Sequence, residues 1–158
     1  MKKIGIEIKW GILFAVIQLL WMLGERLAGL HDENIEYHAK ITNLFALVAI
    51  AVYVVALLDK RKNSYQGKMT WKQGFFAGLI ITAVVTVLTP LTQYITSAII
   101  SPGHFENMIA YTVETEKMTQ EAAEAYFNMK SYMIQSIIFA PVIGIVTSAI
   151  VAVFTRKK

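Results

Sequence analysis

Three histidines are the residues best suited to chemistry, and all of them lie outside the long apolar stretches of the sequence. Each has an acidic side chain nearby in the chain; the six residues are His31, His38, His104, Asp32, Glu36 and Glu106. Imidazole and carboxylate groups are ordinary ligands of transition metals. Their spacing follows no diagnostic ligand pattern, however, and histidines in polar loops are usually free on the surface. We therefore predict no metal site and no cofactor.

Glu25 and Arg26 form the only ionisable pair well inside an apolar stretch. Such groups are costly within a membrane and are often functional. At 1.5 Å per residue, Glu25 lies about 22 Å beyond Trp10, in the outer half of a span that runs outward. Arg26 can extend to the headgroups, whereas Glu25 needs a partner, for which Gln93 and Gln135 lie at the right depth. Glu25 is the residue on which a site would depend.

Polar side chains from all four apolar stretches fall at a similar depth. The candidate cluster consists of Glu25, Arg26, Asn43, Gln93, Tyr94 and Gln135. One interpretation is a small binding site that opens to the outer side of the membrane. The other is an interhelical hydrogen-bond network that only holds the helices together. The sequence favours the network.

Four apolar stretches are long enough to position these groups as membrane-spanning helices. They cover about residues 10–30, 41–58, 74–100 and 132–154, and about 20 residues suffice to cross a bilayer. They are continuously apolar, unlike the alternating strands of a β-barrel. The first is expected to be a retained span, since no small-x-small cleavage site follows it at the right place. We predict an all-α fold, a four-helix transmembrane bundle in a single domain, residues 1–158.

The basic residues predict the orientation. Eleven of them flank the same side of the predicted spans: Lys2, Lys3, Lys9, Lys60, Arg61, Lys62, Lys68, Lys72, Arg156, Lys157 and Lys158. The two loops on the other side hold three lysines and eight acids. Because Lys and Arg are retained in the cytoplasm, both termini should be cytoplasmic.

The external loop between the third and fourth spans should contain an amphipathic helix at about 118–130. Thr119 is a suitable N-cap, and apolar residues recur after it at helical spacing. We expect this helix to cover the outer end of the bundle, although it could also bind a partner or lie in the membrane interface.

Small residues recur at four-residue intervals in two spans. They include Gly74 and Gly78 in the third span, and Gly144 and Ser148 in the fourth. Such rows allow helices to approach closely. Packing of these two spans against each other is the favoured interpretation, and a self-association face or a groove for a partner's helix is the alternative. Pro90 and Pro141 add kinks of the kind found in transporters. A transporter monomer usually has more than four spans, however, and this sequence shows no internal repeats.

Composition excludes several classes of function. The hydrophobic fraction of 56% exceeds that of soluble domains. The absence of cysteine excludes disulfides and cysteine-based chemistry. The net charge of +4 does not indicate nucleic acid binding, because the basic residues border apolar spans with no stacking surface among them. No catalytic motif is recognisable, so we do not expect an enzyme.

Several short phrases of the sequence carry a family resemblance. They are Trp21–Glu25, Gly29–His31, Thr42–Phe45, Ala56–Arg61, Gln73–Phe75, Lys117–Thr119 and Tyr126–Asn128. With these phrases the chain resembles, over nearly its whole length, the 4199 family of domains of unknown function, small multi-pass proteins found mainly in Bacteroidota. The resemblance implies a protein of the bacterial inner membrane, and it assigns no activity and no site residues.

Three functions follow from these observations. The first is a non-enzymatic accessory or scaffold subunit that packs against another integral membrane protein or a second copy of itself. The second is a binding or transport module for a small solute or a lipid headgroup, which would use the outer polar cluster. An enzyme acting on a lipid-linked substrate ranks last. We predict the first.

Overall fold

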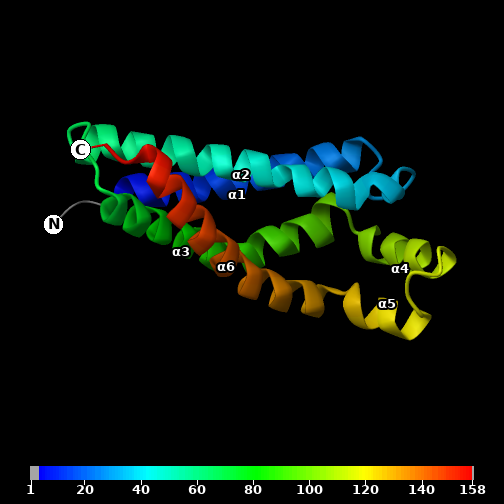
Figure 1. Cartoon of the computed structure of the whole chain (residues 1–158). Helices are drawn as coiled ribbons and strands as arrows, with labels where there is room; N and C mark the ends of the chain where they lie inside the picture. Colours follow the sequence, from blue (N-terminus) through cyan, green and yellow to red (C-terminus); the bar gives the residue numbers. More distant parts are fainter. Residues whose placement is uncertain (1–3, 158) are drawn as a thin grey trace. The chain divides into compact units, whose positions relative to one another are not determined.

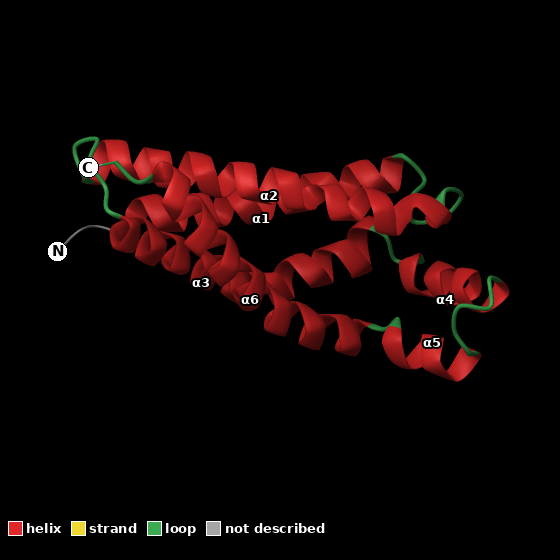
Figure 2. Cartoon of the chain, viewed as in Figure 1, coloured by secondary structure: helices red, strands yellow, loops and turns green. Residues whose placement is uncertain are grey.

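The computed structural model describes residues 4–157, and this part of the chain consists of helices joined by short loops (Figure 1, Figure 2). The elements are α1 (Gly5–Leu27), α2 (Ile35–Ser64), α3 (Trp71–Ile95), the π-helical turn η1 (Thr96–Ile100), α4 (His104–Glu114), α5 (Gln120–Tyr126) and α6 (Met129–Thr155). A single antiparallel bridge between Met69 and Lys157 is the only β-pairing within residues 4–157. The predicted all-α fold class is confirmed.

Four of the helical segments are long and apolar enough to cross a membrane: Gly5–Leu27, Ile35–Ser64, Trp71–Ile100 and Met129–Thr155. Their number and order agree with the prediction, but most of the helices extend beyond the predicted apolar stretches. The second begins at Ile35 rather than near residue 41, and it ends at Ser64 rather than near residue 58. The backbone remains helical through polar residues, whereas hydropathy detects only the apolar centre of a helix.

The described residues form two compact units, and α1, α2, α3 and α6 each contribute to both. Unit 1 comprises the described residues within Met1–Val16, Ala46–Leu88 and Ile138–Lys158, and unit 2 comprises Ile17–Phe45 and Thr89–Ile137. The buried core of unit 1 includes Tyr53, Leu57 and Ile81.

Small residues let α3 and α6 pack closely in unit 1. A Cβ added at Gly78 would lie 2.5 Å from the Ser148 hydroxyl, and one added at Gly144 would lie 2.4 Å from the Thr82 methyl. At Gly74 the nearest atoms belong to Met69 and to Ala152. These rows therefore serve packing within the chain, as the favoured interpretation predicts. At Gly78 and Gly144 they are not a free self-association face.

Unit 1 also holds a buried ion pair, between Glu7 of α1 and Lys60 of α2. The Lys60 ammonium lies 2.8 Å from one Glu7 oxygen and 3.0 Å from the other, and both residues are 2% exposed. Nearby, Asp59 accepts hydrogen bonds from Lys9 at 2.5 Å and from the Trp10 indole at 2.7 Å. Charged groups therefore join α1 to α2 at this end of unit 1.

In unit 2, the shorter helix α5 forms in place of the single amphipathic helix expected at about 118–130, and a second short helix precedes it. Thr119 caps α5 as predicted, its hydroxyl accepting from the Ala122 amide at 3.3 Å. The helix then ends at Tyr126, because Asn128 starts α6 by accepting from the Ser131 amide at 2.9 Å. The other helix, α4, lies N-terminal to the predicted segment and was not expected.

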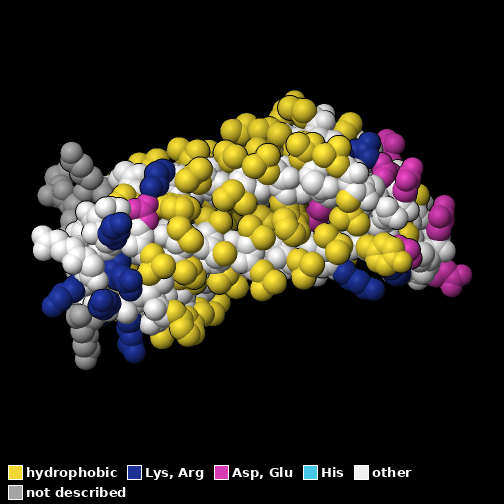
Figure 3. Space-filling view, turned by 90° about the horizontal axis from the view of Figure 1, so that it is seen from above, with side chains coloured by type: hydrophobic (Ala, Val, Ile, Leu, Met, Phe, Trp, Pro, Cys, Tyr) yellow, Lys and Arg dark blue, Asp and Glu magenta, His cyan; other side chains and the backbone are white. Residues whose placement is uncertain are grey.

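The two units differ in the charge of their surfaces (Figure 3). Lys and Arg side chains gather over unit 1, where Arg61 and Lys62 lie at the end of α2 and Lys157 lies beyond the end of α6. Asp and Glu side chains gather over the loops of unit 2. Hydrophobic side chains cover the helices of both units, as expected for surfaces that face lipid.

Candidate functional site

Glu25 is the centre of a buried polar cluster in unit 2. It lies near the end of α1 and is 3% exposed. The Trp21 indole, one turn earlier, donates to one carboxylate oxygen at 2.5 Å. The Thr42 hydroxyl of α2 lies 2.8 Å from both oxygens and donates its proton to one of them. Two neutral donors therefore fix the orientation of the carboxylate.

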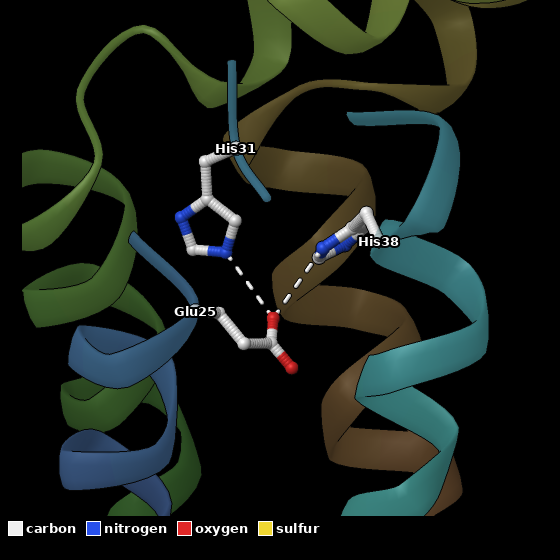
Figure 4. Close-up of side chains that lie close together, drawn as sticks. All are labelled: Glu25, His31 and His38. Atoms are coloured by element: carbon white, nitrogen blue, oxygen red, sulfur yellow. Dashed lines mark hydrogen bonds and ion pairs between the residues drawn. The ribbon is translucent and has the colours of Figure 1, made fainter. Parts of the chain in front are cut away.

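Two histidines approach the same carboxylate oxygen (Figure 4). Nε2 of His31 and Nδ1 of His38 each lie 3.3 Å from Oε2 of Glu25. The side chain of His31 is fully buried, and that of His38 is 13% exposed. One ligand-type atom from each of the three residues lies within 4.8 Å of the other two. The cluster therefore has the composition and dimensions of a small cation site.

A third histidine, His104 of α4, completes the group. Its ring centroid lies 4.7 Å from that of His31 and 4.8 Å from that of His38. Burial, followed by repulsion from His38 and His31, lowers the pKa of His104 to about 3, so its imidazole is neutral at physiological pH. Among the described residues, Nδ1 of His31 and Nδ1 of His104 are buried without a hydrogen-bond partner.

A tight turn between α1 and α2 brings His31 back towards Glu25. Gly29 adopts a left-handed φ of 72° that favours glycine, and the Leu30 amide donates to the Glu25 carbonyl at 3.0 Å. The Asn34 side chain donates to the Ala28 carbonyl at 3.0 Å and closes the turn. His31 therefore lies beside the end of the helix that carries Glu25.

The early start of α2 supplies the other side of the cluster. Because this helix begins at Ile35, His38 and Thr42 lie four residues apart on one helical face. The Thr42 hydroxyl is also 3.3 Å from Nδ1 of His38. On α4, Asn107 lies one turn after His104 and donates from its side chain to the His31 carbonyl at 2.8 Å. Three elements of unit 2 thus converge on Glu25.

The predicted polar cluster forms only in part. Arg26 pairs with Asp32 in the adjacent turn, where the Glu33 amide, and then Arg26, lower the pKa of Asp32. Asn43 is exposed, and Tyr94 is 53% exposed. The two predicted partners bond to residues four positions away along the chain instead: Gln93 donates to Ser97 of η1, and Gln135 donates to Ser131 of α6. Of the six predicted residues, Glu25 alone belongs to the site.

Sequence reasoning also misjudged the histidines. They were expected on the surface, but His31 is 1% exposed and His104 is 7% exposed. The missed signal is the short first loop: a turn of a few residues cannot carry His31 far from Glu25. The four-residue spacing of His38 and Thr42 was a second signal, since it places both side chains on the same face of α2.

An apolar hollow of about 260 Å³ borders the carboxylate. Its lining comes from α1, the following turn and α2: Leu20, Trp21, Gly24, Glu25, Ala28, Leu30 and Ile41. This hollow lies in the same unit as the histidines. The buried carboxylate of Glu25 therefore lies next to open space.

A comparison with known families finds one match. The sequence profile of a family described as "Protein of unknown function (DUF4199)" matches residues 9–157. The chain belongs to this family. The match confirms the resemblance noted from the short sequence phrases, and the family's description assigns no activity. No curated protein and no solved structure matches the chain.

Proposed function

We propose that this protein is a multi-pass protein of the bacterial inner membrane that binds a small, positively charged solute at Glu25. One observation carries the proposal: a buried carboxylate is surrounded by three imidazoles, two of them 3.3 Å from one of its oxygens. It corresponds to the second of the functions considered from the sequence, the solute-binding module.

The alternative explanation is that Glu25 only holds the helices together. A structural role requires hydrogen-bond donors for the carboxylate, and Trp21 and Thr42 already supply them. The nearby histidines add acceptor nitrogens, and Nδ1 of His31 and of His104 is buried without a partner in the described structure. A buried polar atom of this kind costs about 1–3 kcal/mol. What supports a cation site is the approach of His31 and His38 to a carboxylate that already has its donors.

The proposal includes an orientation. Lys and Arg are concentrated beside unit 1, and the acids beside unit 2; Lys2, Lys3 and Lys158 of the basic set lie outside the described residues. The positive-inside rule therefore favours cytoplasmic termini and a site that is reached from the external side. Reporter fusions after Gln66 and after Lys158 should read as cytoplasmic, and a fusion after Glu116 as external. An external signal at Gln66 would contradict this orientation.

A non-enzymatic accessory subunit was the function favoured by the sequence, and one of its supports is lost. That hypothesis relied on the small size, the lack of catalytic residues, the outer amphipathic helix and the small-residue rows as a surface for a second membrane protein or a second copy. Gly78 and Gly144 instead contact Ser148 and Thr82 of the same chain. The solute-binding module is therefore our first proposal, and a partner protein becomes an outcome of the test below.

Purification in a mild detergent followed by native mass spectrometry tests the proposed function. We expect a small cationic species to be retained by the wild-type protein and lost from Glu25→Gln, which keeps the shape of the side chain and removes its charge. Glu36→Gln is the matched control, since Glu36 is an exposed acid on α2. Retention of a stoichiometric protein and no solute would instead favour the accessory subunit.

A further inference from the structure

The cluster around Glu25 has the donor set of a transition-metal site. We propose that Glu25, His31 and His38 bind a divalent transition-metal ion, of which Zn²⁺ is the representative, with His104 as a fourth ligand. This inference rests on the proposed binding function and names the chemical class of its solute. It also reverses the prediction, made from ligand spacing alone, that no metal site is present.

The distances from Glu25 to the two histidines match those between neighbouring ligands of one zinc ion. Zinc is bound by nitrogen and carboxylate oxygen at about 2.0–2.2 Å, so adjacent ligands of a tetrahedral site are about 3.3 Å apart. Nε2 of His31 and Nδ1 of His38 both lie 3.3 Å from Oε2 of Glu25. The same distance is longer than the usual 2.7–3.2 Å of a hydrogen bond from nitrogen to oxygen. The spacing is therefore compatible with a shared cation as well as with long hydrogen bonds.

His104 is positioned to complete four-coordination. Its ring packs against both other histidines, and its Nδ1 is a buried nitrogen without a hydrogen-bond partner in the described structure. The Asn107 side chain, on the same face of α4, is anchored to the His31 carbonyl. Its ring therefore lies beside both histidine ligands, and we propose that it supplies the fourth ligand when the ion binds.

The surrounding residues orient the ligands as they do in metal sites. Ligating carboxylates are usually held by further hydrogen bonds, which fix their direction and adjust their basicity. Here the Trp21 indole and the Thr42 hydroxyl do so for Glu25. Both groups are neutral donors, so they leave the negative charge of the carboxylate available to a cation.

The donor set also selects among metals. Three imidazoles and one carboxylate suit Zn²⁺, Co²⁺, Ni²⁺ or Cu²⁺. Mg²⁺ and Ca²⁺ prefer sites made of oxygen ligands. The chain contains no cysteine, so the thiolates that favour Cu⁺ are absent. The donor set therefore favours divalent transition-metal ions over Mg²⁺, Ca²⁺ and Cu⁺.

Metal titration of the full-length protein tests this inference. The protein should carry an affinity tag without histidines, and it should be treated with a chelator and dialysed before ZnCl₂ is added. We expect one Zn²⁺ per chain by elemental analysis and calorimetry. Co²⁺ should give the intense visible absorption of a tetrahedral complex. The cobalt spectrum is measured on the wild-type protein and therefore does not depend on the folding of any variant.

Substitutions then identify the ligands. Glu25→Gln and His38→Asn should each weaken zinc binding at least about 100-fold, beyond the roughly 10–100-fold effect of losing an outer-sphere group. His104→Ala should weaken it and change the cobalt spectrum. Glu36→Gln should bind like the wild type. His38→Asn serves if Glu25→Gln does not fold, because His38 is the more exposed of the two.

The outcomes separate this inference from the proposed function. Absence of Zn²⁺ and Co²⁺ binding, or equal affinity in the wild type and in both ligand variants, would overturn the metal site. If the wild type then binds ethanolamine or choline and Glu25→Gln does not, the proposed function stands with an organic cation as solute. If neither metal nor amine binds, both proposals are wrong.

Discussion

Replacement of Gly144 by alanine should destabilise unit 1 through a single methyl group. A Cβ at this position would lie 2.4 Å from the Thr82 methyl carbon and 2.6 Å from the Thr82 hydroxyl. The Thr82 side chain cannot move away freely. Its hydroxyl is 2.8 Å from the Tyr53 hydroxyl, and it donates to the Gly78 carbonyl at 2.9 Å. Either α6 must shift away from α3, or these hydrogen bonds must break.

The expected loss is about 1–3 kcal/mol in the free energy of unfolding, the usual effect of an extra methyl group in a packed core. The matched control is Gly24→Ala, at an exposed helical glycine with no atom within 4 Å of the added Cβ. In an open position alanine stabilises a helix by about 0.5–1 kcal/mol relative to glycine. The two substitutions add the same atom, and we therefore expect them to differ in sign.

Reversible unfolding in mixed detergent and SDS micelles measures both variants. A second substitution, Thr82→Ala, removes the two atoms that lie closest to the new methyl group. The double variant Gly144→Ala/Thr82→Ala should therefore lose about 1 kcal/mol less than the sum of its two single variants. Equal stability of Gly144→Ala and Gly24→Ala, or strictly additive losses in the double variant, would refute the close packing of α3 on α6.

Two further substitutions test other contacts. Glu7→Gln should destabilise the protein by about 3 kcal/mol or more, because it removes the charge that compensates the buried Lys60 ammonium. Lys9→Met breaks an ion pair whose lysine is half exposed, and it should lose no more than about 1 kcal/mol in the same unfolding assay. Equal losses in the two variants would contradict the difference in burial. Asn107→Ala should weaken zinc binding about tenfold by calorimetry, since it breaks the hydrogen bond between α4 and the His31 carbonyl. Unchanged zinc affinity would show that α4 does not contribute to the site.

The sequence predicted the fold well, because a membrane span is recognised from the apolar composition of a stretch of about 20 residues. The four spans and the close approach of α3 and α6 follow from hydropathy and from the spacing of small residues such as Gly78 and Gly144. The ends of the helices do not follow from these signals. Neither does α4, which begins just after Gly103 in a stretch of mixed polarity and packs by its histidine and asparagine face.

The site was predicted less well. Glu25 was identified because a carboxylate inside an apolar helix needs a partner. Its partners could not be chosen by depth alone, since depth ignores the direction in which each helix presents its side chains. Gln93 and Gln135 donate hydrogen bonds to Ser97 and Ser131, four residues away along the chain. The turn at Gly29 brings His31 to Glu25 instead.

X-ray absorption at the zinc edge, on the full-length protein loaded with one Zn²⁺ per chain, tests the binding site at Glu25 most directly. The spectrum should show a four-coordinate ion with imidazole nitrogens and a carboxylate oxygen at about 2.0–2.2 Å. Glu25→Gln and His38→Asn should each abolish this spectrum at the same zinc concentration. A six-coordinate ion with oxygen ligands and no imidazole scattering, or a spectrum unchanged in both variants, would contradict a cation site built from Glu25 and the histidines.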